Sequence, residues 1–359
     1  MENKIINLID KLSTEHSLSL SEYEELINGY TKENADYAAK KAKIARKAIY
    51  GNDVYVRGLI EISNFCKNDC FYCGIRKSNK KCQRYRLEKE DILQCAKTGY
   101  ELGFRTFVLQ GGEDMYYSDD VLCNIVKSIK QNYPDCAVTL SLGERERKSY
   151  EKLFLSGADR YLLRHETADS EHYGKLHPSN LSLANRMNCL KILKETGFQT
   201  GCGFMVGSPF QTSKTLAEDL KFIEEFSPEM CGIGPFIPHK DTPFKDCLPG
   251  SCEMTLYLLS VIRIIKPNIL LPATTALGTI NKMGREMGIL AGANVIMPNL
   301  SPSNVREKYE LYNGKLHTGN EAAEQIANLK KSMEKIGYNV VSARGDIKYQ
   351  KRGKTNGSI

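Results

Sequence analysis

Three cysteines, Cys66, Cys70 and Cys73, lie close together in the segment CKNDCFYC. Thiolates are the usual ligands of iron–sulfur clusters. Three of them at this spacing can hold three irons of a cubane cluster and leave the fourth iron open to another ligand. A zinc site with Cys82 as its fourth ligand is the alternative, but zinc sites usually combine two C-x2-C pairs and only one is present. The spacing therefore predicts a 4Fe–4S cluster held by these three cysteines.

The remaining cysteines predict no second metal site. The chain has 12 cysteines, and the nine outside the triad form no other tight cluster motif. Most of them fall in predicted helices or strands, where a free cysteine packs as a small hydrophobic side chain. No cysteine follows Cys252. We therefore expect one 4Fe–4S cluster per chain.

Composition excludes several classes of protein. The 359 residues carry a net charge of +7, with basic runs at 40–47 and 348–354 that are typical of solvated surfaces. The sequence contains no basic motif interleaved with aromatic residues, so we expect no nucleic-acid partner. No apolar run of ~18 residues predicts a membrane span, and the N-terminal MENKIINLIDKL suits an amphipathic helix better than a signal peptide. We expect a cytoplasmic protein without a membrane partner.

The elements that must position the cysteines follow a β–α rhythm. Short apolar runs alternate with amphipathic stretches, and glycine often follows a predicted helix, as helix C-caps favour. The predicted strands are 54–62, 106–110, 137–142, 161–164, 199–206, 230–234, 269–271 and 295–297, with helices such as 89–102, 119–131, 145–156, 183–196, 212–226 and 254–265 between them. This order predicts an α/β fold, a parallel (β/α)8 TIM-type barrel.

The domain organisation follows from the same pattern. We expect an N-terminal helical cap over residues 1–50, the barrel over residues 51–340, and a basic flexible tail over residues 341–359. In such barrels the chemistry lies at the carboxyl ends of the strands. The cysteine triad directly follows the first predicted strand, and polar residues follow most of the others.

The triad and its position resemble the radical S-adenosylmethionine (SAM) superfamily. Within it, the segments EISNFCKNDCFYCGIR, LQGGED, TLSLGE, DRYLLRHETA, GIGPFIPHKDTP, PATTALGTI and GANVIMPN, in this order, are similar to the HydE family of FeFe-hydrogenase maturases. The match runs from about residue 54 to 313. Methylornithine synthase and biotin synthase share parts of the pattern. The resemblance implies reductive cleavage of SAM to methionine and a 5′-deoxyadenosyl radical.

The resemblance also assigns residues to SAM. Gly111, Gly112 and Glu113 match the segment that contacts the methionine amino group. Glu166 matches the ligand of the ribose hydroxyls, and a guanidinium at Arg186 suits the SAM carboxylate. Tyr72 and the backbone near Met205 are expected beside the adenine. An ordinary β–α turn at the glycines and surface salt bridges at Glu166 and Arg186 are the alternatives.

A second set of residues is expected around the substrate in the barrel mouth. Arg164 could bind a substrate carboxylate, and the two threonines at 274 and 275 could add hydroxyl donors; core filling is the alternative. The expected set is Gln110, Thr139, Arg164, Thr274, Thr275, Met297 and Tyr309.

The implied role is assembly of the diiron subcluster of the hydrogenase H-cluster. The substrate is expected to be a small iron-containing precursor, an iron–carbonyl–cyanide–cysteine compound. The alternative is an amino-acid-type substrate, as for a methylornithine-synthase-like or biotin-synthase-like enzyme. The resemblance further implies a reductant such as ferredoxin or flavodoxin, and other hydrogenase maturases as partners. Some family members carry a second cluster on a C-terminal cysteine triplet, whereas residues 311–326, LYNGKLHTGNEAAEQI, contain none.

Overall fold

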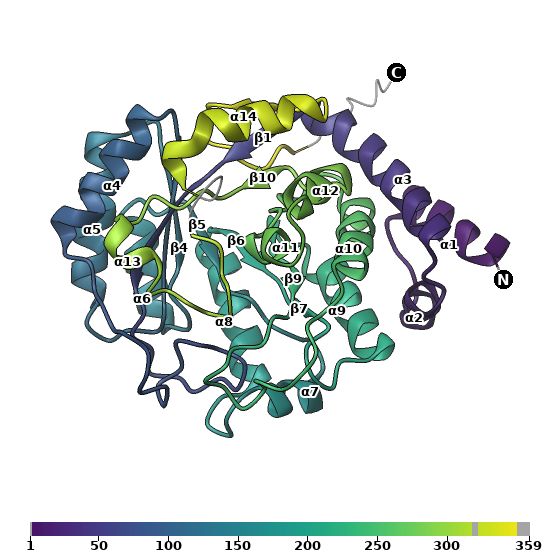
Figure 1. The fold of residues 1–359 in the computed structure, drawn as a ribbon, viewed down its shortest axis with the longest axis horizontal. Coiled ribbons are helices and arrows are strands. Elements are labelled where there is room, and N and C mark those ends of the chain that lie inside the picture. Colours follow the sequence, from purple (N-terminus) through teal and green to yellow (C-terminus); the bar gives the residue numbers. More distant parts are fainter. Residues whose placement is uncertain (1, 318–321, 350–359) are drawn as a thin grey trace, which may run out of the picture.

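Parallel strands around a closed ring form the centre of the molecule (Figure 1). The computed structural model describes residues 2–317 and 322–349. Its main sheet has the order β2-β3-β4-β5-β6-β8, with every neighbouring pair parallel. The strands are β2 (Gly58–Ser63), β3 (Thr106–Gly111), β4 (Ala137–Ser141), β5 (Arg160–Leu162), β6 (Gln199–Cys202) and β8 (Met230–Cys231). The predicted α/β barrel is therefore the observed fold.

Single bridges close the ring where the strands become short. Met230 of β8 pairs with Leu270, and Pro272 pairs with Val295 of β10 (Val295–Ile296). Leu59 of β2 then pairs with Asn299, which completes the circle. A further two-stranded sheet joins β7 (Met205–Val206) to β9 (Gly234–Pro235) near the carboxyl ends of the main strands.

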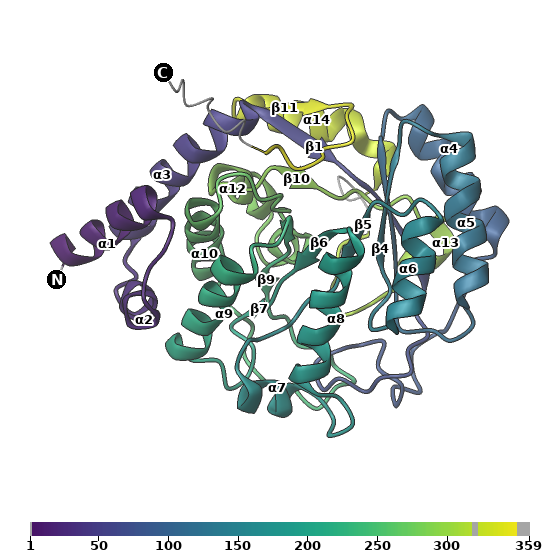
Figure 2. The same cartoon turned by 180° about the vertical axis from the view of Figure 1, so that it is seen from behind.

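Helices cover the outside of the ring (Figures 1 and 2). They are α4 (Lys89–Glu101), α5 (Asp119–Asn132), α6 (Arg147–Leu155), α7 (Ser170–Leu176), α8 (Leu183–Thr196), α9 (Ser213–Phe226), α10 (Cys252–Ile265), α11 (Thr275–Ile280), α12 (Gly284–Leu290) and α13 (Ser303–Arg306). The apolar faces of helices and strands meet in one core that includes Ile92, Leu109, Leu140 and Ile223, all completely buried. Burial of such side chains stabilises each by roughly 1.5–3 kcal/mol.

Three N-terminal helices lie against the outer helices at one side of the barrel (Figure 1). They are α1 (Glu2–Glu15), α2 (Leu20–Asn28) and α3 (Lys32–Tyr50), with α3 packed on α10 and α2 on α9. Ser19 and Thr31 begin α2 and α3 by accepting backbone N–H bonds, as N-cap residues do. Among residues 2–317 and 322–349, no helix combines the length and apolar character needed to cross a membrane.

Four predicted strands differ in the structure. The run 199–206 divides into β6 and β7, and the run 230–234 divides into β8 and β9. The run 54–62 divides at Arg57 into β1 (Asp53–Val56) and β2, because β1 continues alongside β10 in a second sheet. The run 269–271 forms only a bridge at Leu270. The departures at 54–62 and 269–271 lie next to the single bridges that close the ring. Apolar composition alone does not fix the length of a strand.

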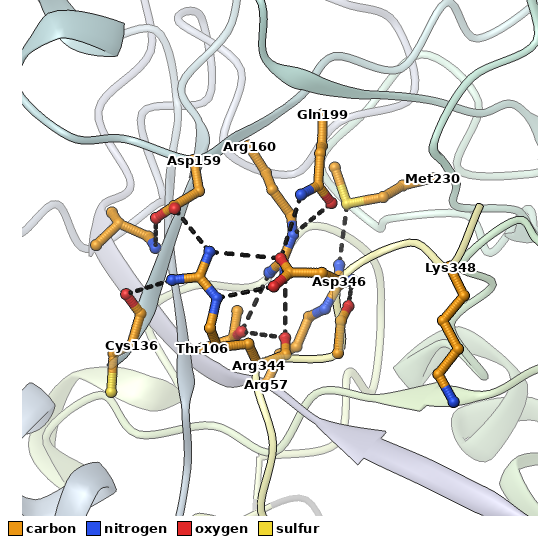
Figure 3. Close-up of polar contacts among 12 residues, drawn as sticks. Arg57, Thr106, Cys136, Asp159, Arg160, Gln199, Met230, Arg344, Asp346 and Lys348 are labelled. Atoms are coloured by element: carbon orange, nitrogen blue, oxygen red, sulfur yellow. Dashed lines mark hydrogen bonds and ion pairs between the residues drawn. The ribbon is translucent and has the colours of Figure 1, made fainter. Parts of the chain in front are cut away.

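The C-terminal segment closes the amino end of the barrel. Helix α14 (Ile326–Lys335) leads to β11 (Asn339–Val341), which pairs with β1 at the end of the molecule opposite the loop that follows β2 (Figure 2). We expected a flexible tail from residue 341, but residues 342–348 make polar contacts under the strands (Figure 3). Residues 350–359 lie outside the described part of the chain.

Charge holds this segment in place. Arg160 of β5 has a completely buried side chain and pairs with Asp346 at 2.5 Å (Figure 3). Arg344 joins both Asp159 and Asp346 at 2.8 Å. Partial burial raises the pKa of Asp346, but the Arg344 and Arg160 guanidiniums lower it by more, so the pKa falls to about 2. The buried arginine is thus neutralised only while the C-terminal segment is docked.

Asp346→Ala should destabilise the fold, because it leaves the buried Arg160 charge without its carboxylate. Breaking a fully buried pair costs roughly 3–5 kcal/mol, and water reaches Asp346, so we expect a loss of about 2 kcal/mol in the free energy of unfolding, measured by urea denaturation. Glu195→Ala, which breaks the exposed pair with Arg147, is the control, with an expected cost below ~1 kcal/mol. Equal costs for the two variants would contradict this account of the segment.

Candidate active site

The cysteine triad lies on the loop between β2 and α4, at the carboxyl end of the barrel. Arg84 holds this loop, donating to the carbonyl oxygens of Asn64, Ile75 and Arg76. Asp69 accepts two bonds from Arg76, at 2.7 and 2.6 Å. The polar residues around the cysteines therefore fold the loop, and they leave the three thiols facing one cavity.

Backbone hydrogen bonds to neighbouring loops fix the position of the cysteine loop at the carboxyl end of the barrel. The backbone N–H of Lys67 donates to Glu113, that of Phe71 to Leu176 and that of Gly74 to Leu311, at 2.8–3.0 Å. Gly112 is required at the closest of these approaches, because a Cβ there would lie 2.2 Å from the Phe65 carbonyl oxygen. The loops after β2 and β3 thus meet beside Cys66.

The donor set fits a cluster better than one metal ion. Within residues 2–317 and 322–349, no three His, Cys, Asp or Glu side chains are close enough to bind a single ion. Ligands of a cubane cluster bind different irons and so need to stand farther apart than ligands of one zinc ion. Cys66, Cys70 and Cys73 nevertheless line the same cavity. This geometry disfavours the zinc alternative.

Burial keeps the three thiols protonated in the absence of metal. Desolvation raises the pKa of Cys66, raises that of Cys70 to about 12, and raises that of Cys73 well above its ordinary value. The neighbouring thiols add to this for Cys70 and Cys73. A buried thiolate becomes favourable only beside positive charge, and metal binding supplies that charge while releasing protons. Three adjacent, partly buried thiols are thus suited to a cationic iron core.

One cavity of about 350 Å³ contains nearly all the residues expected from the sequence. Its wall includes the triad and, from the set expected at SAM, Tyr72, Gly111, Gly112, Glu113, Glu166, Arg186 and Met205. From the set expected at the substrate it includes Gln110, Arg164, Thr274, Thr275, Met297 and Tyr309. Thr139 lies on β4, 1% exposed, and is not among the lining residues. The roles of all these residues remain predictions.

Two charged residues expected at SAM are already held by protein partners. Arg186 of α8 donates from Nε to Glu144 at 2.6 Å and from Nη1 to the carbonyl of Arg164. Glu113 accepts the Glu144 N–H at 3.0 Å and lies 3.3 Å from the Lys67 ammonium. Glu144 lies within the segment TLSLGE but was given no role from the sequence; its carboxylate orients the Arg186 guanidinium, and Arg186 lines the cavity.

Glu166 has an unusual backbone conformation. Its φ is +68°, in the left-handed region that costs a non-glycine residue roughly 1–2 kcal/mol. Its N–H donates to Gly203 at 3.0 Å. Its Oε2 lies 3.1 Å from Arg164 Nη2, yet neither atom makes a hydrogen bond. Such strain is typical of functional sites, where the surroundings hold a side chain in one place.

Several buried polar atoms at or near the cavity lack partners. They include the hydroxyl oxygens of Thr139 and Thr274 and the Nε of Arg164. Buried polar groups are nearly always hydrogen-bonded. These atoms, with the Glu166 oxygen that makes no hydrogen bond, therefore fit polar ligands in the cavity.

The deep side of the cavity contains an ion pair that sequence reasoning missed. Glu61, completely buried on β2, accepts from Lys315 at 2.6 Å and from Asn299 at 2.8 Å. The Lys315 ammonium also lies 5.0 Å above the ring of Tyr309. The sequence does indicate Glu61, because a carboxylate inside an apolar strand is unusual. It does not indicate Lys315, which lies many residues after the last predicted strand.

Comparison with known proteins agrees with this architecture. The family model described as "Radical SAM superfamily" matches residues 60–223. The [FeFe] hydrogenase maturase subunit HydE of Thermotoga maritima is 47% identical over 83% of this chain and 85% of its own. The 3-methylornithine synthase of Methanosarcina barkeri is 28% identical over 84% of this chain and 85% of its own. The crystal structure of methylornithine synthase (PylB) superposes with a TM-score of 0.81 at 26% identity, covering 93% and 97% of the two chains.

The barrel, the cysteine loop and these matches define a radical SAM enzyme. Such an enzyme uses a 4Fe–4S cluster and SAM. Within this class, the chain belongs to the HydE family of [FeFe] hydrogenase maturases. The lower identity to methylornithine synthase makes the amino-acid alternative the weaker one.

Replacing any one of Cys66, Cys70 and Cys73 by serine should remove most bound iron and abolish SAM cleavage, because each thiolate holds a different iron. Iron analysis and the visible spectrum after anaerobic reconstitution measure this. The matched control is Cys82→Ser, on the same loop, which should keep both iron and cleavage. Iron loss in the Cys82 variant, or a normal cluster spectrum in a triple triad variant, would contradict the ligand assignment.

Proposed function

We propose that this enzyme reductively cleaves SAM to methionine and a 5′-deoxyadenosyl radical, and that it acts in maturation of the FeFe-hydrogenase H-cluster, at assembly of the diiron subcluster. The observation that carries the proposal is the single cavity shared by the cysteine triad and the polar residues of the barrel mouth. A radical formed beside the triad would reach a substrate in that cavity without crossing water. The family relationship supplies the biological context.

The chain's own residues bind and orient SAM in this proposal. Cys66, Cys70 and Cys73 would hold the cluster, which when bound would supply the electron for SAM cleavage. The backbone at Gly111 and Gly112, with Glu113, receives the methionine amino group. Arg186, oriented by Glu144, takes the carboxylate through charge-assisted bonds. Glu166 accepts from the ribose hydroxyls, and Tyr72 and Met205 flank the adenine.

The barrel interior binds the substrate, for which we propose a small iron-containing precursor. Arg164 and Thr274 offer the buried unpaired groups described above, and Gln110 and Tyr309 lie 3.5 Å apart on the opposite wall. Thr275 and Met297 complete the wall, and Thr139 lies buried behind it. Donors and a guanidinium suit the anionic ligands of such a precursor. The barrel surrounds the reacting groups and excludes water.

Partners and compartment follow from the same chemistry. Electron delivery to the cluster requires a one-electron reductant, for which ferredoxin or flavodoxin is proposed, and H-cluster assembly requires other maturases. We place the enzyme in the cytoplasm. All 12 cysteines are free thiols, as expected in a reducing compartment.

Glu166→Ala and Arg186→Ala should each weaken SAM binding while the cluster is retained. Each removes a charge-assisted bond worth roughly 1.5–3 kcal/mol, which corresponds to about a ten- to hundredfold rise in Kd. Equilibrium binding of SAM to the reconstituted enzyme measures the effect. Lys191→Ala, at an exposed position of the helix that carries Arg186, is the control. Unchanged affinity in both variants would refute the assignment.

We also propose that each chain holds one cluster. Thiolates are the ligands such a cluster requires, and no cysteine follows Cys252. Reconstituted enzyme freed of adventitious iron should contain about four irons and four sulfides per chain, with a single EPR signal on reduction. About eight irons and two distinct EPR signals would show that a second cluster is held by other ligands.

A further inference from the structure

The segment that carries Glu166 is held in its strained conformation by a buried residue of another element. Residues 165–168 turn between β5 and α7, and all of them except Ala168 are buried. The backbone of Glu166 pairs with β6's extension at Phe204, which fixes one side of the turn. The other side faces α9, on the outer surface of the barrel.

Asp219 of α9 reaches this turn. The residue is completely buried. Its Oδ1 accepts the backbone N–H of Ala168 at 2.6 Å and lies 3.2 Å from Nε2 of His165. It therefore contacts the residue before Glu166 and one just beyond it. A single carboxylate oxygen thus spans the strained position without touching the Glu166 side chain.

The tautomer of His165 determines which atom donates in its contact with Asp219. The Gly203 N–H donates to His165 Nδ1 at 3.2 Å, so Nδ1 carries no proton and Nε2–H donates to Asp219. Burial lowers the pKa of His165 to about 3, which keeps the ring neutral in this tautomer. The chain Gly203–His165–Asp219–Ala168 is consequently a continuous set of hydrogen bonds around the turn.

We infer that Asp219 is a positioning residue for SAM: it holds the 165–168 turn so that the Glu166 carboxylate faces the ribose. Asp219 is not among the residues that line the cavity. Its effect passes through the backbone on both sides of Glu166. The inference rests on the proposed role of Glu166. It adds a residue of α9 that acts on the SAM site indirectly.

A purely structural role for Asp219 predicts a different result. A buried acceptor that only stabilises the fold would lower stability and leave the affinity of the folded enzyme for SAM unchanged. A positioning role changes affinity, and only while Glu166 is present to use the position. Because residues that act through one another are not additive, a double-mutant cycle separates the two roles.

The experiment measures the Kd of SAM for reconstituted, cluster-loaded enzyme by anaerobic equilibrium binding. Asp219→Ala should raise the Kd roughly tenfold, as loss of an outer partner does at metal sites. Asp219→Asn, whose amide oxygen still accepts both bonds, should restore near-normal affinity. In a Glu166→Ala background, Asp219→Ala should cause no further loss.

Glu224→Ala is the matched control. Glu224 lies on the same helix and accepts buried bonds from Ser17 and Tyr23, so its loss should lower the Tm without changing the Kd of SAM. If Asp219→Ala folds poorly, Asp219→Leu keeps the volume and removes the acceptors. The cluster spectrum is recorded for each variant.

Each remaining outcome overturns one statement. Normal affinity in Asp219→Ala beside weak affinity in Glu166→Ala would overturn the positioning role alone. Equal losses from Asp219→Ala with and without Glu166 would show that Asp219 acts elsewhere. Normal affinity in Glu166→Ala would overturn the ribose assignment, and the positioning inference with it.

Discussion

The parallel direction of all the barrel strands is the constraint on which the site depends. Because every strand runs the same way, the loops after β2, β3, β5 and β9 open at one end of the ring. The cysteine loop, the 111–113 turn and the 165–168 turn, far apart in the sequence, therefore line one cavity. A cluster ligated by three residues of a short loop can then share its open iron with a ligand bound by several other loops. The opposite end needs only to be closed, which residues 342–348 do.

Buried charge is used differently at the two ends of the barrel. At the amino end, Arg160 meets Asp346 and Arg344 meets Asp159, so the charges are paired and the contact is structural. At the carboxyl end, Arg164 and Glu166 lie close without a hydrogen bond. Ion pairs with full hydrogen bonds fix a segment, whereas buried polar atoms that make no hydrogen bond favour binding of a ligand that satisfies them. The cavity end also contains the paired Glu61–Lys315 and Arg186–Glu144 contacts, so it combines fixed charges with polar groups that are open to a ligand.

Much of the site could be predicted from the sequence because its signals are local. The cysteine triad, the glycines after β3 and the RHET segment each follow a predicted strand. A parallel barrel therefore predicts that they lie close together at one end. The substrate side was predicted through resemblance, and Thr139 lies outside the cavity wall. The sequence predicted no role for Lys315, Glu144 and Asp219, because each acts across long sequence distances. Their contacts depend on how helices and loops pack, which periodicity does not determine.

Residues 307–317 form a loop that carries no cysteine but contacts the cysteine loop and the wall of the cavity. Leu311 accepts the N–H of Gly74 at 2.8 Å, next to Cys73, and Asn313 donates to Pro238 at 3.1 Å. The loop therefore lies across two neighbouring loops, and its Lys315 extends inward to Glu61. Removing one partner of a buried ion pair destabilises a protein strongly, because the other charge stays buried without compensation. Displacement of the loop would leave the buried Glu61 carboxylate without its cation, so the Glu61–Lys315 pair fixes the position of a segment that contributes no cysteine but lines the cavity.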